Sequence, residues 1–341
     1  MLDLAPRHRP TTQSRLLALA ALTALAAALV LAASSHAVGP YPSLGSCQVF
    51  PQPPASTSPR ARSLPTEAAW NQDISKGPRD PRSAAYISYI LANGGGSIHP
   101  DFGSPRGYGI PYAVVGSGQA KLPVHYTAYG DESDRGPFPI PANAPVEGGQ
   151  QAEGDRHVIA VDRDACMLYE LFGAHFVGGR KPHWDAESGT KWDLSSASRR
   201  RDRLTSADAA GLPIFPGLVR YDEVAAGQLN HAIRMTVEST QNAWIHPASH
   251  CAGDTSAGNA PPMGLRLRLK ASYGIGRFSG PAKTIATAMK QYGMIIADNG
   301  SNWYISGSSD RRWDDENLDQ LKQIPGRAFE VVKSAAGLHR C

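Results

Sequence analysis

The chain has 341 residues, with 34 Lys and Arg against 30 Asp and Glu, and its formal net charge is +4. So small an excess argues against a nucleic-acid-binding protein, because such proteins gather a strong positive charge on one face. Gly and Pro are plentiful, at 34 and 27 residues, while only 19% of the residues are charged. This composition favours a loop-rich β protein over a helical bundle.

The N-terminus has the pattern of a secretory signal peptide over residues 1–37. A basic segment precedes an apolar run at 16–33, and Ser35-His36-Ala37 offers small residues for cleavage after Ala37. The run is also long enough to span a bilayer, so a retained N-terminal anchor is the alternative. In both cases we expect the rest of the chain to act outside the cytoplasm, secreted and free of the membrane once the signal is removed.

The exported part divides into two expected regions. Residues 38–67 are rich in Pro and Ser, which predicts an extended arm or linker. Residues 68–341 are expected to form a single β-rich domain, and we expect it to be a monomer.

Four cysteines follow the signal-like segment, at Cys47, Cys166, Cys251 and Cys341. An even number in an exported chain indicates two disulfides, and three pairings are possible. Because domain termini are often close together, the pair Cys47–Cys341 is favoured, which leaves the other two to each other. A metal cluster of His246 and His250 with Cys251 is disfavoured, because no second Cys lies nearby. We therefore expect no metal and no cofactor.

Three helices are predicted from apolar spacing and end signals. In chain order they cover residues 83–92, 279–292 and 314–323. The first begins at Ser83 and ends at Asn93-Gly94, and the second begins at Ser279 and ends at Gly293.

Strands dominate the rest of the prediction. Residues 157–161 and 166–172 form a hairpin, 218–224 pair with 229–237, 265–270 form one clear strand, and 294–297 pair with 303–306 across Asp298-Asn299-Gly300. Many strands with few helices predict a mainly β fold, with a β-sandwich or jelly-roll-like core.

Several motifs between residues 140 and 332 resemble those of a family of exported microbial proteins whose activity is uncharacterised. They include TSADAAGLPIFPGLVRYDEV, PPMGLRLRLKASY and YGMIIADNGSNWYISG. The resemblance implies a shared fold and an extracellular location. It assigns no catalytic residue.

The candidate acid and base residues come from the chemistry of glycoside hydrolysis, which needs two carboxylates across a cleft. The carboxylates in unusual local settings are Glu147, Glu170, Asp193, Asp208, Glu223 and Asp298. We selected Glu170, Asp208 and Glu223 as catalytic candidates. Asp208 has an alternative role in the first turn of a short helix, and Asp298 fits a simple Asp-Asn-Gly turn.

His157 is the candidate base or orienting group. Asp155 and His157 point the same way on a strand, so the carboxylate is able to orient the imidazole. The alternative is a local salt bridge at the start of the strand.

The candidate binding residues for an anionic substrate are Arg234, Arg266 and Arg268. Arg266 and Arg268 alternate with leucines, so they share one face of a strand, which either lines a groove or is an ordinary solvated face. Arg234 lies on the opposite face from His231, which we expect to be a core histidine.

Trp303 and Trp313 are the candidate sugar platforms. Five tryptophans, Trp184, Trp192, Trp244, Trp303 and Trp313, lie in loop-like or strand-end settings, and we expect one or two of them to be exposed.

These features favour a secreted carbohydrate-active protein, a polysaccharide hydrolase or lyase that uses paired carboxylates in a groove. The alternative is a non-catalytic glycan-binding or cell-wall-associated protein, and a purely structural extracellular protein ranks third. The sequence contains no GxSxG nucleophile elbow and no HExxH metalloprotease motif. The expected partner is an extracellular polysaccharide.

Overall fold

The structure is a computed structural model of the chain, and it describes residues 39–50, 69–103, 107–196, 199–253 and 255–341. The predicted signal peptide, and residues 51–67 of the predicted arm, lie outside the described residues. The mainly β prediction is confirmed, with 25% strand against 15% helix. No helix among the described residues is both long and apolar enough to cross a bilayer.

The first sheet contains the predicted hairpin. Its strands are β1 (Ala113–Val115), β3 (Val158–Asp162), β4 (Met167–Phe172) and β7 (Ser188–Asp193), in the order β1-β3-β4-β7. The strands β3 and β4 pair antiparallel, as predicted. Every residue of β3 is buried, because both faces of this sheet are covered.

A second, smaller sheet packs on one face of the first. It consists of β2 (Val124–Tyr126), β5 (His175–Val177) and β6 (His183–Ala186), in the order β2-β6-β5. Trp184 of β6 is fully buried and shares one apolar cluster with Val158, Ala160 and Leu171 of the first sheet. Side chains alternate along a strand, so the other face of the small sheet points outward.

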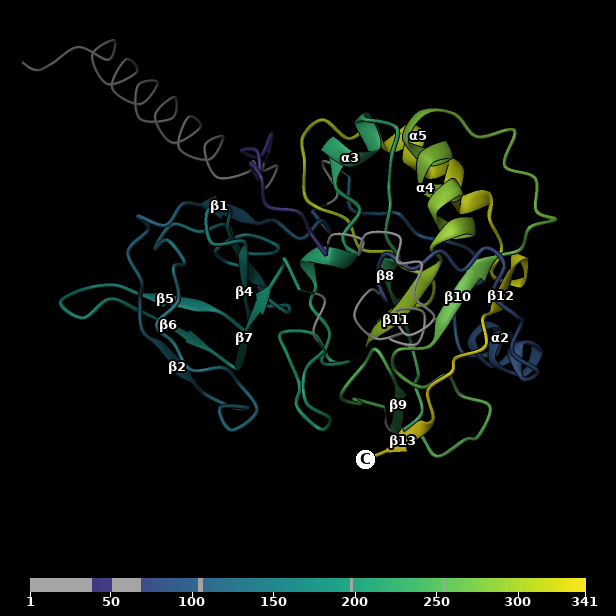
Figure 1. Cartoon of the computed structure of the whole chain (residues 1–341), viewed down its shortest axis with the longest axis horizontal. Helices are drawn as coiled ribbons and strands as arrows, with labels where there is room; N and C mark the ends of the chain where they lie inside the picture. The colour runs from purple at the N-terminus through teal and green to yellow at the C-terminus, as the bar shows by residue number, and fades with distance from the viewer. Residues whose placement is uncertain (1–38, 51–68, 104–106, 197–198, 254) are drawn as a thin grey trace, which may run out of the picture. The chain divides into compact units, whose positions relative to one another are not determined.

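The third sheet lies against the opposite face of the first. Its strands are β8 (Ile233–Val237), β10 (Arg266–Leu269), β11 (Met294–Asn299) and β12 (Phe329–Val331), in the order β12-β10-β11-β8. Ile159 and Leu168 of the first sheet belong to the same core cluster as Ile233 and Ile295 of the third. The main core therefore lies between these two sheets. A short pair, β9 (Ala243–Ile245) with β13 (Leu338–Arg340), lies near the C-terminus (Figure 1).

The helices cover the third sheet. Helix α4 (Gly280–Gln291) contacts β10, helix α2 (Ser83–Ala92) contacts β12, and α5 (Asp315–Asp319) packs beside α4 (Figure 1). The 3₁₀ turns are η2 (Phe215–Gly217), η3 (Gln320–Gln323) and η4 (Gly326–Ala328). All three predicted helices are confirmed, the last as α5 followed by η3.

Two predicted strand pairings are wrong. Residues 221–225 form the short helix α3 (Tyr221–Ala225) with Asp222 and Glu223 in its first turn, where acids stabilise a helix. Residues 303–306 form no hairpin with β11, because β11 already has β10 and β8 as neighbours. Ile305 instead forms a bridge to Met235 of β8.

Two disulfides are present, but the favoured pairing was wrong. Cys47 is bonded to Cys166, and Cys251 to Cys341. Residues 39–50 run beside the first sheet, where the Phe50 amide donates to Leu194 O, and Cys166 immediately precedes the strand β4. The C-terminal strand β13 pairs with β9, which brings Cys341 to the segment that follows β9.

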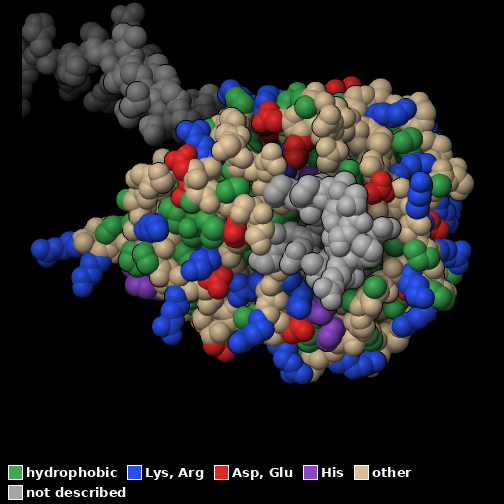
Figure 2. Space-filling view, in the orientation of Figure 1, with side chains coloured by type: hydrophobic (Ala, Val, Ile, Leu, Met, Phe, Trp, Pro, Cys, Tyr) green, Lys and Arg blue, Asp and Glu red, His purple; other side chains and the backbone are tan. Residues whose placement is uncertain are grey.

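The surface charge is mixed. On the face seen in Figure 2, Lys and Arg side chains are dispersed and alternate with Asp and Glu. This distribution agrees with the small net charge of +4.

Candidate functional site

The candidate site is a pocket of about 450 Å³ between the first and third sheets. Its lining brings together residues far apart in the sequence, including Tyr129, Asp155, His157, Asp208 and Asp298. Two of these, His157 and Asp208, were predicted as catalytic residues.

Arg234 of β8 organises the carboxylates at the base of this pocket. Its Nε and Nη2 donate to the two oxygens of Asp208, at 3.0 and 2.8 Å, in a bidentate pair. Nη2 also donates to Asp298 Oδ2 at 2.7 Å, and Nη1 to Ser306 Oγ at 2.8 Å. Burial opposes the charge of the guanidinium, but Asp208 and Asp298 outweigh that effect and raise the pKa of Arg234. Arg234 was predicted to hold a substrate anion, but its donors are occupied by the protein's own carboxylates.

A β-bulge in β11 brings Asp298 to the same face as Arg234. The strand pairs in parallel with β8, and Ile295 lies opposite Arg234. The register shifts between Ile296 and Asp298, so Asp298 lies opposite Thr236, which shares its face with Arg234. Without the bulge, Ala297 would lie opposite Thr236 and Asp298 opposite Val237, so the Asp298 side chain would point to the other face of the sheet.

The bulged residue also fixes the loop that carries Asp208. The amide of Ala210 donates to Ala297 O at 2.9 Å. Within this loop, the hydroxyl of Ser206 accepts from the Asp208 amide at 2.9 Å and donates to Leu212 O at 2.6 Å. The two acids held by Arg234 therefore come from a strand and a loop that are tied together at one point.

Asp298 has the environment of a general acid. Burial raises its pKa to about 6; Arg234 opposes this shift, and the nearby carboxylate of Asp208 adds to it. Its Oδ1 accepts from the Asn299 amide at 2.8 Å. A carboxyl group with this pKa carries a proton in a substantial fraction of molecules under mildly acidic conditions.

His157 forms a buried ion pair with Glu147. The Nδ1–Oε2 distance is 2.5 Å, and Nε2 donates to Ala207 O at 3.0 Å. Burial favours the neutral imidazole, but the Glu147 carboxylate outweighs this effect and raises the pKa of His157 to about 9. Both ring nitrogens are occupied, so His157 serves here as a cation rather than as a base. Its partner is Glu147, whereas the sequence suggested Asp155, which is exposed at the pocket.

Glu170 lies behind the pocket and not in it. Its carboxylate is completely buried and accepts from the amides of Ile214 and Phe215 at 2.9–3.1 Å, at the start of η2. Burial raises the pKa of Glu170 to about 7, although the two amides partly offset the shift. This contact joins β4 to η2, so the structure gives Glu170 an anchoring position rather than a place in the pocket.

Glu223 lies at a different site from Asp208. It pairs with Arg220 and with His231 Nε2, the latter at 3.3 Å, beside a separate pocket of about 610 Å³. His231 is buried, as expected for a core histidine. The structure therefore brings Asp208 and His157 together but separates Glu223 from them.

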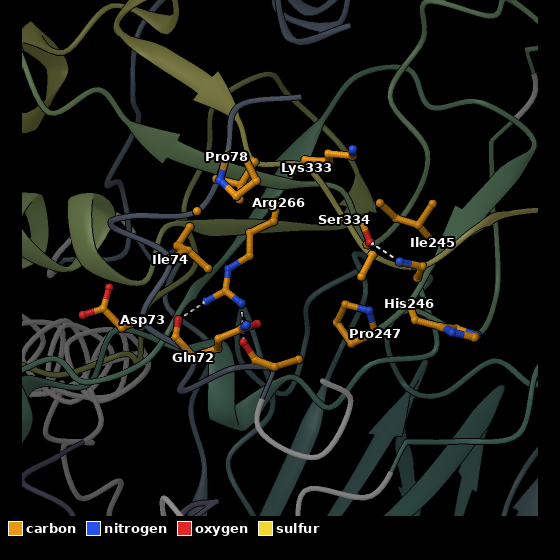
Figure 3. Close-up of a pocket in the computed structure, with 16 residues that line it drawn as sticks. Gln72, Asp73, Ile74, Pro78, Ile245, His246, Pro247, Arg266, Lys333 and Ser334 are labelled. Atoms are coloured by element: carbon orange, nitrogen blue, oxygen red, sulfur yellow. Dashed lines mark hydrogen bonds between the residues drawn. The ribbon is translucent and has the colours of Figure 1, made fainter. Parts of the chain in front are cut away.

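Arg266 lines a third pocket, of about 380 Å³. Figure 3 shows its guanidinium directed toward the backbone of Gln72, with Lys333 on another side of the pocket. It donates to the carbonyl oxygens of Ala69, Gln72 and Tyr292, the last at 2.8 Å from Nε and 2.6 Å from Nη2. Burial lowers the pKa of Arg266, and Asp73 offsets this only in part.

Arg268 is held by the protein in a similar way. It pairs with Glu330 at 2.6 Å and donates to the carbonyl groups of Ile74, Ser75 and Gly77. The predicted cationic face of β10 is therefore bound to residues 69–77 and β12, and it is not an open groove.

The expectation of exposed tryptophans was wrong. Trp303 is completely buried and stacks on Phe329, while Trp313 is 5% exposed and donates to Ser308 O at 2.9 Å. The other three, Trp184, Trp192 and Trp244, are buried as well. The exposed aromatic at the candidate site is Tyr129, which is 47% exposed.

Asp298 and Glu147 both belong to the site, but the sequence pattern did not favour them as catalytic residues. Asp298 matched a turn, because Asp-Asn-Gly is a common turn sequence, yet it lies within β11. Glu147 lies ten residues before His157 in an irregular segment, and nothing in the local pattern shows that the two meet. The β-bulge that places Asp298 beside Arg234 has no strong sequence signature, so the sequence pattern did not reveal the role of Asp298.

No protein-family model, curated protein or solved structure matches this chain. The pocket that contains Asp298, Asp155 and the Arg234 cluster is therefore interpreted from its own chemistry.

Proposed function

We propose that the protein is an extracellular glycan hydrolase in which Asp298 is the general acid and Asp155 is the second carboxylate. The observation that carries this proposal is that both acids line one pocket in contrasting environments. Asp298 is largely buried, with its pKa raised to about 6, whereas Asp155 is exposed. Pairs of carboxylates in unlike environments are typical of acid and base roles in glycoside hydrolysis.

In this mechanism each residue has one task. Asp298 donates its proton to the glycosidic oxygen as the bond to the anomeric carbon breaks. Asp155 takes a proton from the attacking water, or attacks the anomeric carbon itself in a two-step reaction. Arg234 and Asp208 position Asp298, and the exposed ring of Tyr129 offers a surface for the apolar face of a sugar.

The extracellular setting rests on two kinds of support. The signal-like segment at 1–37 predicts export, and two disulfides join the four cysteines of the chain. Disulfides persist mainly in oxidising compartments.

Incubation with a panel of neutral and uronic polysaccharides tests the proposal. We expect release of reducing ends from at least one substrate, and a loss of about 100-fold or more in kcat for Asp298→Asn, because the general acid typically contributes 10²–10⁴-fold. The matched control is Asp164→Asn, an exposed carboxylate in the β3–β4 turn outside the pocket, which should retain full activity.

Three outcomes would count against the hydrolase. A panel without any reducing-end release removes the enzymatic reading. Unchanged turnover in Asp298→Asn removes the assignment of the acid. A rise in unsaturated-uronate absorbance indicates elimination, and the protein would then be a lyase.

A non-catalytic glycan-binding function is the second candidate, and the Arg266 pocket favours it. Among the described residues, the hydrogen bonds of this guanidinium all go to neutral carbonyl groups, and Lys333 lines the same pocket. An anionic sugar carboxylate would supply the missing charge.

Titration with uronate oligosaccharides distinguishes this candidate from the first. Lys333→Ala should weaken binding several-fold without affecting the fold, because Lys333 is exposed. Lys121→Ala, exposed and outside the pocket, is the control. Equal affinity in the two variants would remove the Arg266 pocket from consideration.

A further inference from the structure

The outward face of the β2-β6-β5 sheet carries a row of metal-ligating side chains. His125 of β2 and His175 of β5 both lie directly opposite Asp185 of β6. Directly opposite residues share a face, and His183 joins them because it precedes Asp185 by two positions. The alternate residue of β6, Trp184, is buried beneath. Three strands thus place three histidines and one carboxylate on one surface.

Three of these side chains converge on one point. Asp185 Oδ1 is 3.3 Å from His183 Nε2 and 3.7 Å from His125 Nδ1. The nearest ligand atoms of all three residues lie within 4.8 Å of one another. Zn–N and Zn–O bonds of about 2.0–2.2 Å in a tetrahedral site separate neighbouring ligand atoms by about 3.3 Å. The observed spacing therefore suits a single ion.

The tautomer of His183 is fixed by the backbone. Its Nδ1 lies 2.8 Å from the carbonyl oxygen of Lys181, which only accepts hydrogen bonds, so Nδ1 carries the proton. In the neutral ring Nε2 then directs a lone pair at Asp185 Oδ1, and two lone pairs repel unless a cation lies between them. Donation of the second ring nitrogen to a backbone carbonyl is the usual arrangement of a metal-binding histidine.

Two other clusters among the described residues are less suited to a metal. In the cluster of Glu147, Asp155 and His157, both imidazole nitrogens already have partners. In the cluster of Asp202, His246 and His339, the guanidinium of Arg199 competes for the Asp202 carboxylate.

We propose that His125, His183 and Asp185 bind one divalent transition-metal ion of the Zn²⁺ or Cu²⁺ class, with His175 opposite Asp185 on the same face. Imidazole and carboxylate ligands suit these ions. The side chains of His125 and Asp185 are 62% and 38% exposed, so the site is open on its outer side. An ion held there keeps positions for water or for a ligand in solution.

The test is titration of the full chain, without a polyhistidine tag, with Zn²⁺ against a chromophoric chelator and with Cu²⁺ followed by electron paramagnetic resonance. We expect one ion per chain, with nitrogen hyperfine coupling from at least two imidazoles. His183→Ala, His125→Ala and Asp185→Asn should each weaken binding about tenfold or more, because each removes a direct ligand. His175→Ala should have a smaller effect.

His339→Ala is the matched control, because it removes a histidine from the cluster that contains Asp202. Binding lost in His339→Ala but kept in His183→Ala would place the ion elsewhere and overturn the proposal. Absence of binding at micromolar Zn²⁺ and Cu²⁺ would overturn it as well. All of these outcomes are independent of the glycan assays.

Discussion

Arg234 and Arg266 lie in one row of the same sheet, yet their surroundings differ. Ile295 of β11 lies opposite both of them, Arg234 on one side and Arg266 on the other. Arg234 is held by two carboxylates, which raise its pKa, whereas Arg266 is held by neutral carbonyl groups and burial lowers its pKa. The difference shows that one sheet stabilises buried cations in two ways, and that only the first brings buried carboxylates together.

The largest effect is expected for Arg234→Met. Removal of the guanidinium leaves Asp208 and Asp298 buried without their partner, and breaking such a pair costs about 3–5 kcal/mol. Urea unfolding at neutral pH measures the free energy of unfolding. Replacing both carboxylates by Asn in the same variant should restore part of the loss, because no unpaired charge is then buried. A loss smaller than that of Arg266→Met would reverse the comparison.

The pH dependence of the free energy of unfolding should come from the buried ionisable groups around the Arg234 cluster and not from Arg266. Glu147 raises the pKa of His157 to about 9 from 6.5, so the stabilisation is complete below pH 6.5 and is lost as the pH rises through 9. One pKa unit corresponds to about 1.4 kcal/mol, so this loss is on the order of 3 kcal/mol. The pKa of Glu170 is raised from 4.5 to about 7, so the free energy of unfolding also falls as the pH rises from 4.5 to 7.

Unfolding curves recorded from pH 5 to 9 check this dependence. In His157→Gln, the free energy of unfolding should decrease less steeply above pH 6.5. In Glu170→Gln, it should decrease less steeply below pH 7. Arg266→Met should retain the full slope. A wild-type protein with constant stability over this range would contradict the assigned ion pair.

Arg266→Met should cost less, about 2 kcal/mol. The substitution removes hydrogen bonds to carbonyl groups, each worth about 0.5–1.5 kcal/mol, but it leaves no carboxylate without its partner. The carbonyl groups of Ala69 and Gln72 are near a pocket and are able to bind water instead. Thermal and urea unfolding should therefore rank this variant between wild type and Arg234→Met, and a loss above 4 kcal/mol would mean that the two arginines are equivalent.

The smallest change is expected for Glu330→Gln, at about 1 kcal/mol or less. Its partner Arg268 keeps three carbonyl contacts, and the substituted amide keeps an oxygen that is able to accept a hydrogen bond from Arg268. Urea unfolding at low and at high salt is the measurement. The effect should shrink as salt increases, and a salt-independent loss would argue against an ion-pair contribution.

Regular elements with strong local signals were predictable from the sequence. Helix α2 spans residues 83–92 as predicted, because its apolar spacing and its Asn-Gly end agree. Strand β10 followed from simple alternation, and the β3–β4 hairpin from two apolar runs joined by Asp162-Arg163-Asp164. Residues 221–224 were wrongly predicted as the end of a strand because their apolar side chains outweighed the two acids that favour a helix start.

The candidate site was predictable only in part, because long-range contacts create it. Asp208, His157 and Arg234 were selected as individual residues, but the pairing of Arg234 with Asp208 and Asp298, and of His157 with Glu147, was not predicted. The bidentate pair between Arg234 and Asp208 joins residues 26 positions apart, and the single hydrogen bond from Arg234 to Asp298 joins residues 64 apart. The disulfide pairing was predicted wrongly for the same reason, because the pairing of β13 with β9 is what brings Cys341 to Cys251.

The extra residue Ala297 lets one strand serve two environments. Before Ala297 in the sequence, β11 is an ordinary core strand, and after Ala297 the same strand presents Asp298 to the pocket. An insertion of one residue exchanges the two faces of a strand from that point on. The bulge absorbs this shift, so Asp298 stays opposite Thr236 and on the Arg234 face, and the place of the acid in the pocket depends on the backbone conformation at one small residue rather than on a new loop.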